Sequence, residues 1–218
     1  MFYHKSESNV LQKAIAYPSR LSVHNLYVVG AHNFDEQDEV LQVFPNIHNL
    51  VLFEPNKKCV NKLRTLTIPN CCIQIMPVAI GNKIENVIMT ITDNDGASSS
   101  IKTLDRHLEY YQTIKAIGKE TVPMTTLQDT KNFIQVLPEA LLIDVEGCEI
   151  EVLQGMDDLM AKNLKFVMVE TCPDNLYKNV PATLPEVIHI LKSFGLDHIY
   201  YEDIEPTTPN HGNSLFVK

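Results

Sequence analysis

No apolar run in the 218-residue sequence approaches the ~18 residues that a helix needs to cross a bilayer. The first residues, Met1 to Glu7, lack the basic region and apolar stretch of a secretory signal, so we expect no cleaved leader. The five cysteines, two of them adjacent, do not provide a disulfide framework and are typical of reduced thiols. These absences predict a cytoplasmic protein that does not associate with a membrane.

Clustered positive charge is missing as well. Lys and Arg are scattered along the chain, and the formal net charge is −9. A protein that binds nucleic acid through its phosphates needs a basic stripe, so we expect no nucleic-acid partner. A bound cation or an uncharged small molecule is easier to reconcile with this charge balance.

Several motifs that carry chemistry in other proteins are absent. There is no P-loop, no Gly-x-Ser-x-Gly nucleophile turn, and no pair of Cys or His at zinc-ligand spacing. The run from Asp93 to Gly96 resembles part of an EF-hand, but the first and last positions of that loop would be Ile91 and Lys102, which are not proper ligands. We therefore predict no bound metal.

The composition that remains is that of one ordinary globular domain, with 44% apolar and 21% charged residues. Short apolar runs alternate with amphipathic segments, which predicts an α/β doubly wound, mostly parallel sheet with an antiparallel C-terminal strand. Strands are expected at 26–29, 50–53, 73–76, 140–143, 166–169, 199–201 and 214–217. Helices are expected at 10–16, 35–44, 59–66, 150–160 and 184–194.

The remaining segments complete the predicted organisation. Residues 1–25 are interpreted as an N-terminal helix and loop extension, and residues 26–218 as the domain itself. Residues 78–82 and 87–91 are interpreted as a hairpin appended to the third strand. Residues 93–120 are the least regular part of the chain and are predicted to form a loop and lid.

Informative residues follow four of the predicted strands, at the end where ligands bind to a sheet of this kind. Gly30 follows the first strand, Glu54 the second, Asp144 and Glu146 the fourth, and Glu170 the fifth. Glu54 lies 24 positions after Gly30, close to the spacing at which an acidic side chain binds ribose hydroxyls. The alternatives are a turn glycine that the fold alone requires and a solvated carboxylate.

The residues of the turn after the first strand help to distinguish between two possible adenosine-containing cofactors, a dinucleotide and S-adenosyl-L-methionine. A dinucleotide site needs three glycines so that pyrophosphate can approach the backbone, and only Gly30 is present. The next helix begins with four carboxylates between Asp35 and Glu39, which favour a helix N-terminus but repel phosphate. S-adenosyl-L-methionine has no phosphate and carries a sulfonium cation, so this methyl donor is favoured. A nicotinamide oxidoreductase is the more distant alternative.

Several short motifs occur in the order typical of FkbM-type methyltransferases, and the resemblance covers roughly residues 26–217. The most specific are Phe53-Glu54-Pro55-Asn56 and Ile143-Asp144-Val145-Glu146-Gly147-Cys148-Glu149, each weak alone but specific together at this spacing. The others are Gly30-Ala31, Ala79-Ile80-Gly81, Ser98-Ser99, Thr126-Leu127, Val152-Leu153-Gln154-Gly155, Glu170 and Asn213-Ser214-Leu215-Phe216-Val217.

The resemblance implies a class I methyltransferase fold, S-adenosyl-L-methionine as donor, and O-methylation of a saccharide or natural-product-like small molecule. The residues expected to bind the donor are Gly30, Ala31, His32, Asn33, Glu54, Pro55, Ala79 and Asp144. The candidate catalytic residues are Asp144, Glu146, Glu170 and His211, since a hydroxyl loses its proton as the methyl transfers. Tyr110, Tyr111 and residues 172–183 are expected to shape the acceptor pocket, with ordinary surface loops as the alternative.

The donor loop departs from the family's pattern, which resembles Asp-x-Gly-Ala-Asn-x-Gly. Val28 stands at the Asp position, His32 at the Asn position and Phe34 at the second Gly position, and Leu142 replaces a Lys. The lost acidic residue removes a charge partner, and the lost glycine crowds the backbone turn. These changes predict either altered donor contacts through His32 and Asn33 or donor binding that is weakened or lost. The alternative function is therefore a catalytically impaired, methyltransferase-shaped binding or assembly module.

Most candidates also have a simpler structural interpretation. Asp144 and Glu146 precede a helix, where acidic residues commonly cap the N-terminus. His32 can be a loop histidine bonded to the backbone, and residues 98–100 can form a polar turn. Cys148 lies at a helix start without a clear base partner, so we expect it to be a packing residue.

Overall fold

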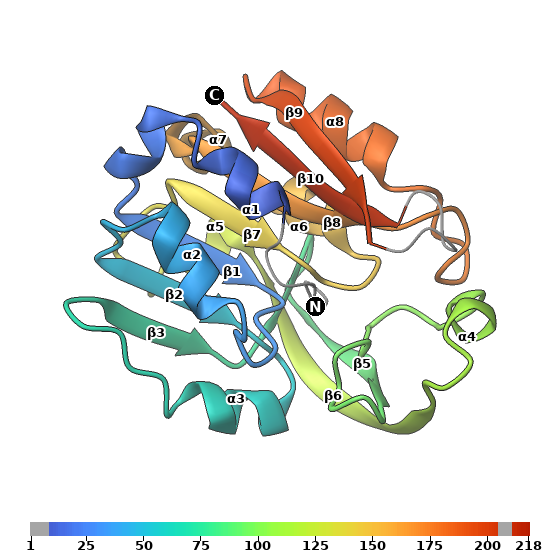
Figure 1. Cartoon of the computed structure of the whole chain (residues 1–218). Coiled ribbons are helices and arrows are strands. Elements are labelled where there is room, and N and C mark those ends of the chain that lie inside the picture. The colour runs from blue at the N-terminus through green and yellow to red at the C-terminus, as the bar shows by residue number, and fades with distance from the viewer. Residues whose placement is uncertain (1–8, 205–210) are drawn as a thin grey trace.

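A computed structural model of the chain describes residues 9–204 and 211–218, whose strands form a large and a small sheet (Figure 1). Within these residues the large sheet has seven strands in the order β3-β2-β1-β7-β8-β10-β9. These strands are β1 (Asn25–Val29), β2 (Asn49–Phe53), β3 (Cys72–Met76), β7 (Ala140–Ile143), β8 (Phe166–Thr171), β9 (Asp197–Asp203) and β10 (Gly212–Val217).

The pairing of the large sheet confirms the predicted architecture. β1 runs parallel to β2 on one side and to β7 on the other, and β7 runs parallel to β8. β10 then lies antiparallel between β8 and β9. The four consecutive buried apolar residues of β7 place it in the middle of the sheet, where both faces are covered.

Helices cover both faces of the large sheet, and Figure 1 shows α1 and α2 in front of it. The helices are α1 (Asn9–Ala14), the 3-10 helix η1 (Pro18–Ser22), α2 (Gln37–Val43), α3 (Lys57–Leu63), α4 (His107–Tyr110), α5 (Leu127–Thr130), α6 (Glu149–Gln154), α7 (Asp158–Asn163) and α8 (Leu184–Ser193). Alternate residues of β1 point to opposite faces. Leu26 and Val28 join the core beneath α1 and α2, whereas Tyr27 and Val29 join the core beneath α6, α7 and α8.

The small sheet corrects one prediction. Its strands are β4 (Ala79–Gly81), β5 (Glu85–Thr92) and β6 (Ala116–Thr126), in the order β4-β6-β5. The predicted hairpin of residues 78–82 with 87–91 is wrong, because β6 lies between β4 and β5 and pairs with both. β6 escapes prediction because its sequence mixes glycine, proline and charged residues, and most of its side chains are exposed.

The segment between β5 and β6 contains the short helix α4 and is otherwise irregular. Residues 116–120, which the predicted lid of 93–120 includes, belong to β6 instead. Thr90 and Ser100 exchange backbone hydrogen bonds, and Leu104 forms a bridge with Tyr177. These contacts join the segment to β5 on one side and to the loop after β8 on the other.

The single helix predicted over residues 150–160 is also wrong, because two helices are present. α6 is capped at Gly155, and α7 starts after Asp157, whose side chain accepts a hydrogen bond from the backbone N–H of Met160 at 3.0 Å. A β-carbon on Gly155 would overlap the carbonyl oxygen of Gly81. The break therefore lets the chain approach the small sheet, a close contact that apolar periodicity does not reveal.

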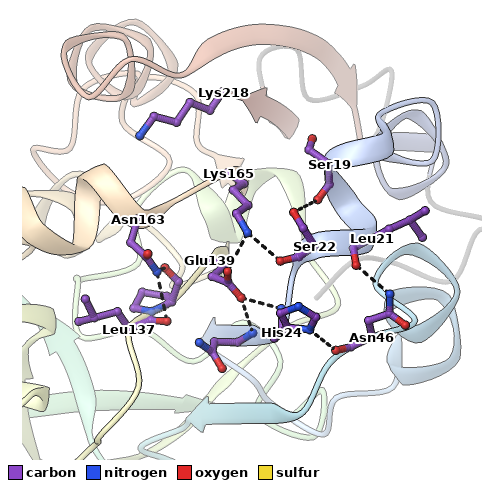
Figure 2. Close-up of polar contacts among 12 residues, drawn as sticks. Ser19, Leu21, Ser22, His24, Asn46, Leu137, Glu139, Asn163, Lys165 and Lys218 are labelled. Atoms are coloured by element: carbon purple, nitrogen blue, oxygen red, sulfur yellow. Dashed lines mark hydrogen bonds and ion pairs between the residues drawn. The ribbon is translucent and has the colours of Figure 1, made fainter.

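Glu139 joins several segments near the starts of β1, β7 and β8 (Figure 2). Its carboxylate accepts hydrogen bonds from the backbone N–H groups of His24 at 2.7 Å and Asn25 at 3.1 Å, and from Lys165 Nζ at 2.7 Å. Lys165 also donates to the carbonyl of Ser22. Burial raises the pKa of Glu139, but Lys165 and the backbone donors outweigh it and hold that pKa below its ordinary value. This network fixes the N-terminal extension to the sheet.

All five cysteines are free, as expected, and three of them, Cys59, Cys148 and Cys172, are buried. Within residues 9–204 and 211–218, every helix is too short or too polar to span a bilayer.

Candidate functional site

The turn after β1 is the first part of the site. Gly30 has a φ of 82°, and the backbone N–H groups of Gly30 and Ala31 both donate to the carbonyl of Phe53 at 3.0 Å. A β-carbon on Gly30 would overlap the carbonyl oxygen of Asp144 at the end of β7. Glycine is therefore required both by the left-handed backbone and by the neighbouring strand. The turn brings together the ends of β1, β2 and β7.

Glu54 follows β2 and is bonded to this turn. Its Oε2 accepts a hydrogen bond from the backbone N–H of His32 at 2.7 Å, and its Oε1 accepts one from Asn56 at 2.6 Å. The residue is only 6% exposed, and burial raises the pKa of its carboxyl to about 7, although the two backbone bonds oppose this. Each oxygen keeps a further lone pair for a ligand hydroxyl.

An open cavity of ≈ 620 Å³, its mouth included, lies beside Gly30 and Glu54. Six of the residues expected to bind the donor line it: Gly30, His32, Glu54, Pro55, Ala79 and Asp144. Ala31 is buried in the core instead, and Asn33 is outside the lining. Apolar side chains supply much of the remaining surface, namely those of Val29, Phe53, Val78, Ile80, Met89 and Ile101.

Three of the four residues that depart from the family's pattern, Val28, Phe34 and Leu142, lie outside this cavity, whereas the fourth, His32, lines it. Phe34 has a φ of 53°, and its side chain is buried in the core shared with α1 and α2. Val28 and Leu142 belong to the same core and are partners in the register of β1 and β7. The side chain of Phe34 therefore does not occupy the cavity, because it packs in this core.

The structure supports part of the simpler interpretation of His32, a loop histidine bonded to backbone, and of Cys148, a packing residue. The Nε2 atom of His32 lies 3.2 Å from the carbonyl oxygen of Asp95, so the ring is bonded to backbone although the residue lines the cavity. Burial lowers the pKa of His32. Cys148 also lines the cavity, but burial raises the pKa of its thiol well above the ordinary value, which suits a packing residue.

Three carboxylates gather where β7 and β8 end. One oxygen from each of Asp144, Glu146 and Glu170 lies within 4.8 Å of the others. Burial, with the neighbouring carboxylates, raises the pKa of Asp144 to about 6 and that of Glu146 to about 7. Neither residue caps α6, whose N-cap is Cys148. The cluster can attract a cation, and it is close enough to share a metal ion, which motif spacing cannot reveal because the residues come from different strand ends.

Glu146 is held in place by two neighbours. Its carbonyl oxygen accepts a hydrogen bond from Ser100 Oγ at 2.6 Å, and its carboxylate accepts one from the hydroxyl of Tyr177. Gly147 has a φ of 96°, and a β-carbon there would strike the Tyr177 ring. The Glu-Gly pair of the motif therefore makes a tight turn against Tyr177, which sequence reasoning did not identify.

His211 connects β8 to the irregular segment. Its Nε2 lies 2.8 Å from Glu170 Oε1, and its Nδ1 lies 2.8 Å from the hydroxyl of Tyr111. Burial lowers the pKa of His211, but the hydrogen bond and charge of Glu170 raise it overall, to about 9. With both ring nitrogens engaged, His211 orients Glu170 and Tyr111 and is poorly placed to take a proton itself.

A smaller cavity of ≈ 360 Å³, its mouth included, adjoins the first, since Ala97 and Glu146 line both. Its lining consists of Ala97, Ser98, His107, Tyr111, Ile114, Glu146, Glu170, Ile204 and His211. Sequence reasoning missed His107, which lies in the irregular segment and is buried. One signal in the sequence could have indicated that His107 lies beside Tyr111: the two residues are four positions apart, as neighbours on one helix face are. Their ring centroids lie 4.9 Å apart.

Comparison with known proteins gives one family and several similar folds. A family model described as "Methyltransferase FkbM domain" matches residues 29–198. A search of curated proteins gives no match. The structure of methyltransferase FkbM from Methylobacillus flagellatus KT matches with a TM-score of 0.58 and 12% identity. The match covers 90% of this chain but only 44% of that protein's chain. The fibrillarin pre-rRNA processing protein of Methanococcus jannaschii has a TM-score of 0.50 and 13% identity, over 94% of this chain and 72% of that one.

At such identities the solved structures are similar in fold alone, and that fold is the predicted class I methyltransferase fold. The family match covers more than half of the chain and includes Gly30, Glu54, Asp144 and Glu170, whereas His211 lies beyond its end. It also supports the expected donor, S-adenosyl-L-methionine. The chain therefore belongs to the FkbM methyltransferase domain family.

Proposed function

We propose that the protein is an S-adenosyl-L-methionine-dependent O-methyltransferase that acts on a hydroxyl of a saccharide or similar small-molecule acceptor. The observation that carries the proposal is the Glu54 carboxylate, which two backbone N–H groups hold beside the Gly30 turn in the large cavity. A carboxylate at the end of this strand is suited to accept hydrogen bonds from ribose hydroxyls. Five free cysteines are in keeping with a cytoplasmic location, which we also propose.

The residues of the large cavity fit the donor's chemistry. Among the described residues that line it there is no Lys or Arg, whereas Glu54, Asp144 and Glu146 are present. Such carboxylates attract a sulfonium cation and repel the phosphates of a dinucleotide. Glu54 would hold the ribose, and apolar side chains such as those of Val78 and Ile80 would pack against the adenine.

When bound, the donor would supply an electrophilic methyl group: the acceptor oxygen would form a C–O bond as the C–S bond breaks onto sulfur, and the hydroxyl proton would pass to a base of the protein. Asp144 is the proposed base, because a carboxyl with a pKa of about 6 is mostly ionised at neutral pH yet can accept a proton. Glu146, oriented by Tyr177, and Glu170, oriented by His211, would bind the acceptor. Alignment of the reacting atoms would supply most of the rate enhancement.

The alternative of an inactive binding or assembly module was favoured by Val28, Phe34 and Leu142. All three side chains are buried in the core beneath α1 and α2, and none lines the large cavity. These departures from the family pattern therefore give the module no specific support.

Isothermal titration calorimetry with S-adenosyl-L-methionine and S-adenosyl-L-homocysteine tests the donor site. We expect the wild-type protein to bind both, and Glu54→Gln to bind them at least about tenfold more weakly, because an amide NH2 would face a backbone donor. Glu139→Gln is the matched control: it also removes a carboxylate that accepts two backbone N–H groups, but near the strand starts (Figure 2). Equal affinity in Glu54→Gln, or no binding by the wild type, would refute the donor site.

Transfer of an isotope-labelled methyl group to a panel of saccharides tests the reaction itself. Label is expected in an acceptor hydroxyl, and base-stable methyl ethers identify O-methylation rather than an ester. If the protein binds the donor but transfers label to none of the acceptors, the alternative function, a binding or assembly module, is favoured.

A further inference from the structure

The smaller cavity meets the large one at Glu146, which lines both. Its other polar groups come from distant parts of the chain. Ser98, His107 and Tyr111 come from the segment between β5 and β6, Glu170 comes from β8, and His211 directly precedes β10. A ligand in this cavity would therefore adjoin the carboxylates that face the donor site. Two of the residues that line it, Glu146 and Glu170, are those proposed above to bind the acceptor.

His107 gives this cavity an unsatisfied polar group. The residue is only 1% exposed, and its Nδ1 has no hydrogen-bond partner among the described residues. Its ring is packed between aromatic neighbours, with centroids 4.9 Å from that of Tyr111 and 5.9 Å from that of Tyr177. Burial, with the charge of His211, lowers the pKa of His107 to about 4, so the imidazole is neutral near pH 7. A buried nitrogen of this kind is costly unless a ligand bonds to it.

The charges around the cavity discriminate against anions. Among the described residues, neither cavity is lined by Lys or Arg. The positive charge of His211 is already engaged by Glu170 at 2.8 Å. Among the residues that the structure describes, a phosphate or carboxylate beside Glu146 and Glu170 would therefore meet no free counter-charge, and burying an unpaired anion is strongly unfavourable.

An uncharged hydroxyl is matched to the same groups. It donates to carboxylates such as Glu146 and Glu170, and it can accept from or donate to the hydroxyl of Tyr111. A hydroxyl that comes within reach of His107 Nδ1 would satisfy it in either tautomer, because a hydroxyl is both donor and acceptor.

We propose that the smaller cavity is the acceptor subsite, that it takes an uncharged, hydroxyl-rich acceptor, and that His107 and Tyr111 bind that acceptor. This inference rests on the proposed function, since an acceptor placed there adjoins the donor cavity through Glu146. It adds a restriction on the substrate class: sugars that carry a phosphate or a carboxylate near the reacting hydroxyl are excluded.

Ligand-observed NMR on protein saturated with S-adenosyl-L-homocysteine tests the restriction directly. The probes are the methyl glycosides of glucose, galactose and mannose, each compared with its own 6-phosphate and its own uronate. We expect at least one uncharged glycoside to bind, and its two anionic forms to bind at least about tenfold more weakly. Anionic forms that bind as well as the parent sugar, or no binding by any uncharged glycoside, would overturn the proposal.

Two variants test the assigned residues. His107→Phe keeps the aromatic packing and removes the nitrogen, and Tyr111→Phe keeps the ring and removes the hydroxyl. Each is expected to weaken glycoside binding at least about fivefold while the affinity for S-adenosyl-L-homocysteine stays unchanged. His189→Phe, on the exposed side of α8, is the matched control and is expected to bind the glycoside normally.

The donor measurement separates the two possible failures. Loss of donor binding in the wild-type protein contradicts the proposed function. Normal donor binding with unchanged glycoside affinity in both His107→Phe and Tyr111→Phe contradicts only the acceptor subsite. A variant that unfolds is recognised by its lost donor affinity, and the other variant then decides.

Discussion

Val28 on β1 and Leu142 on β7 are partners in the parallel register, and both side chains lie in the core beneath α1 and α2. The FkbM pattern places Asp and Lys at these two positions. Opposite charges on register partners would form a buried ion pair, which this chain replaces with an apolar pair. Such a replacement is commonly neutral, or stabilising by about 1–4 kcal/mol. The two departures thus lie on register partners, and neither side chain lines the large cavity.

Restoring the charges one at a time should show coupling between the two positions. Val28→Asp alone is expected to lower the free energy of unfolding by about 3–5 kcal/mol, because it buries an unpaired carboxylate. In the double variant with Leu142→Lys, the loss of unfolding free energy is expected to be at least about 1 kcal/mol smaller than the sum of the losses in the two single variants. Urea denaturation of the four proteins in the cycle measures the coupling.

The control for this cycle places the lysine one strand further away. Met168 pairs with Leu142 and not with Val28, so Val28→Asp with Met168→Lys should show much weaker coupling. Equal coupling in both cycles would mean that the charges are not acting as register partners.

Substitution of Gly30 should damage fold and donor site together. Gly30→Ala places a β-carbon against the Asp144 carbonyl and forces alanine to a φ of 82°, a backbone conformation that alone costs about 1–3 kcal/mol. We expect a lower Tm and loss of affinity for S-adenosyl-L-homocysteine. Gly118→Ala, in β6 with open space around it, should leave both unchanged or raise the Tm slightly. Normal donor affinity in Gly30→Ala would contradict the role assigned to the turn.

The pH dependence of methyl transfer should report on Asp144. A base must be ionised, so the rate is expected to rise as pH passes through about 6, the pKa of that carboxyl. Asp144→Asn should lose about 100-fold in kcat at saturating donor, with no rise near this pH. The measurement is a pH profile of labelled methyl transfer at saturating donor. An unchanged profile in Asp144→Asn would assign the base elsewhere in the cluster.

Glu149 should make the protein less stable as pH rises. Its side chain is buried, and burial raises its pKa from 4.5 to about 8, although the backbone N–H of Gly147 donates to it. The folded state thus holds a proton that the unfolded state releases above pH 4.5. The contribution of this bound proton to the free energy of unfolding is fully present below pH 4.5 and is lost as pH rises towards about 8.

Glu149→Gln should remove this dependence because glutamine resembles the protonated acid. We expect the stability of Glu149→Gln relative to wild type to increase by a few kcal/mol between about pH 5 and pH 8, measured by urea denaturation. Glu186→Gln, an exposed carboxylate on α8, should follow the wild type across this range. A constant difference between Glu149→Gln and wild type would show that Glu149 is ionised in the folded protein.

The large sheet was predictable because its strands are short apolar runs with local boundaries. Ala140 to Ile143 is apolar throughout, and such a segment is stable only where both faces are covered. β6 could not be recognised in the same way, because it is stabilised by pairing with both β4 and β5 rather than by its own apolar pattern. The break between α6 and α7 was hidden for a related reason: Gly155 is required by a contact with Gly81, which is distant in sequence.

The donor side of the site was likewise more predictable than the proposed acceptor side. Gly30 and Glu54 follow strands directly, so the sequence alone indicates that they share one end of the sheet. His107 and Tyr177 lie in irregular segments, and their positions depend on contacts such as the Tyr177 hydroxyl with Glu146. The consequence of Val28 and Leu142 was hidden because only the register makes them neighbours.

The close approach of Gly30 to the Asp144 carbonyl makes the tips of β1 and β7 a single mechanical unit. Neither tip can shift to accommodate a different acceptor without displacing the other. In the proposed acceptor subsite, by contrast, Glu170 belongs to β8, but most of the lining comes from residues 97–114 and from Ile204 and His211, outside the parallel strands. Under the proposed function, new acceptor preferences can evolve by exchanging those segments while the machinery for the methyl donor is inherited unchanged.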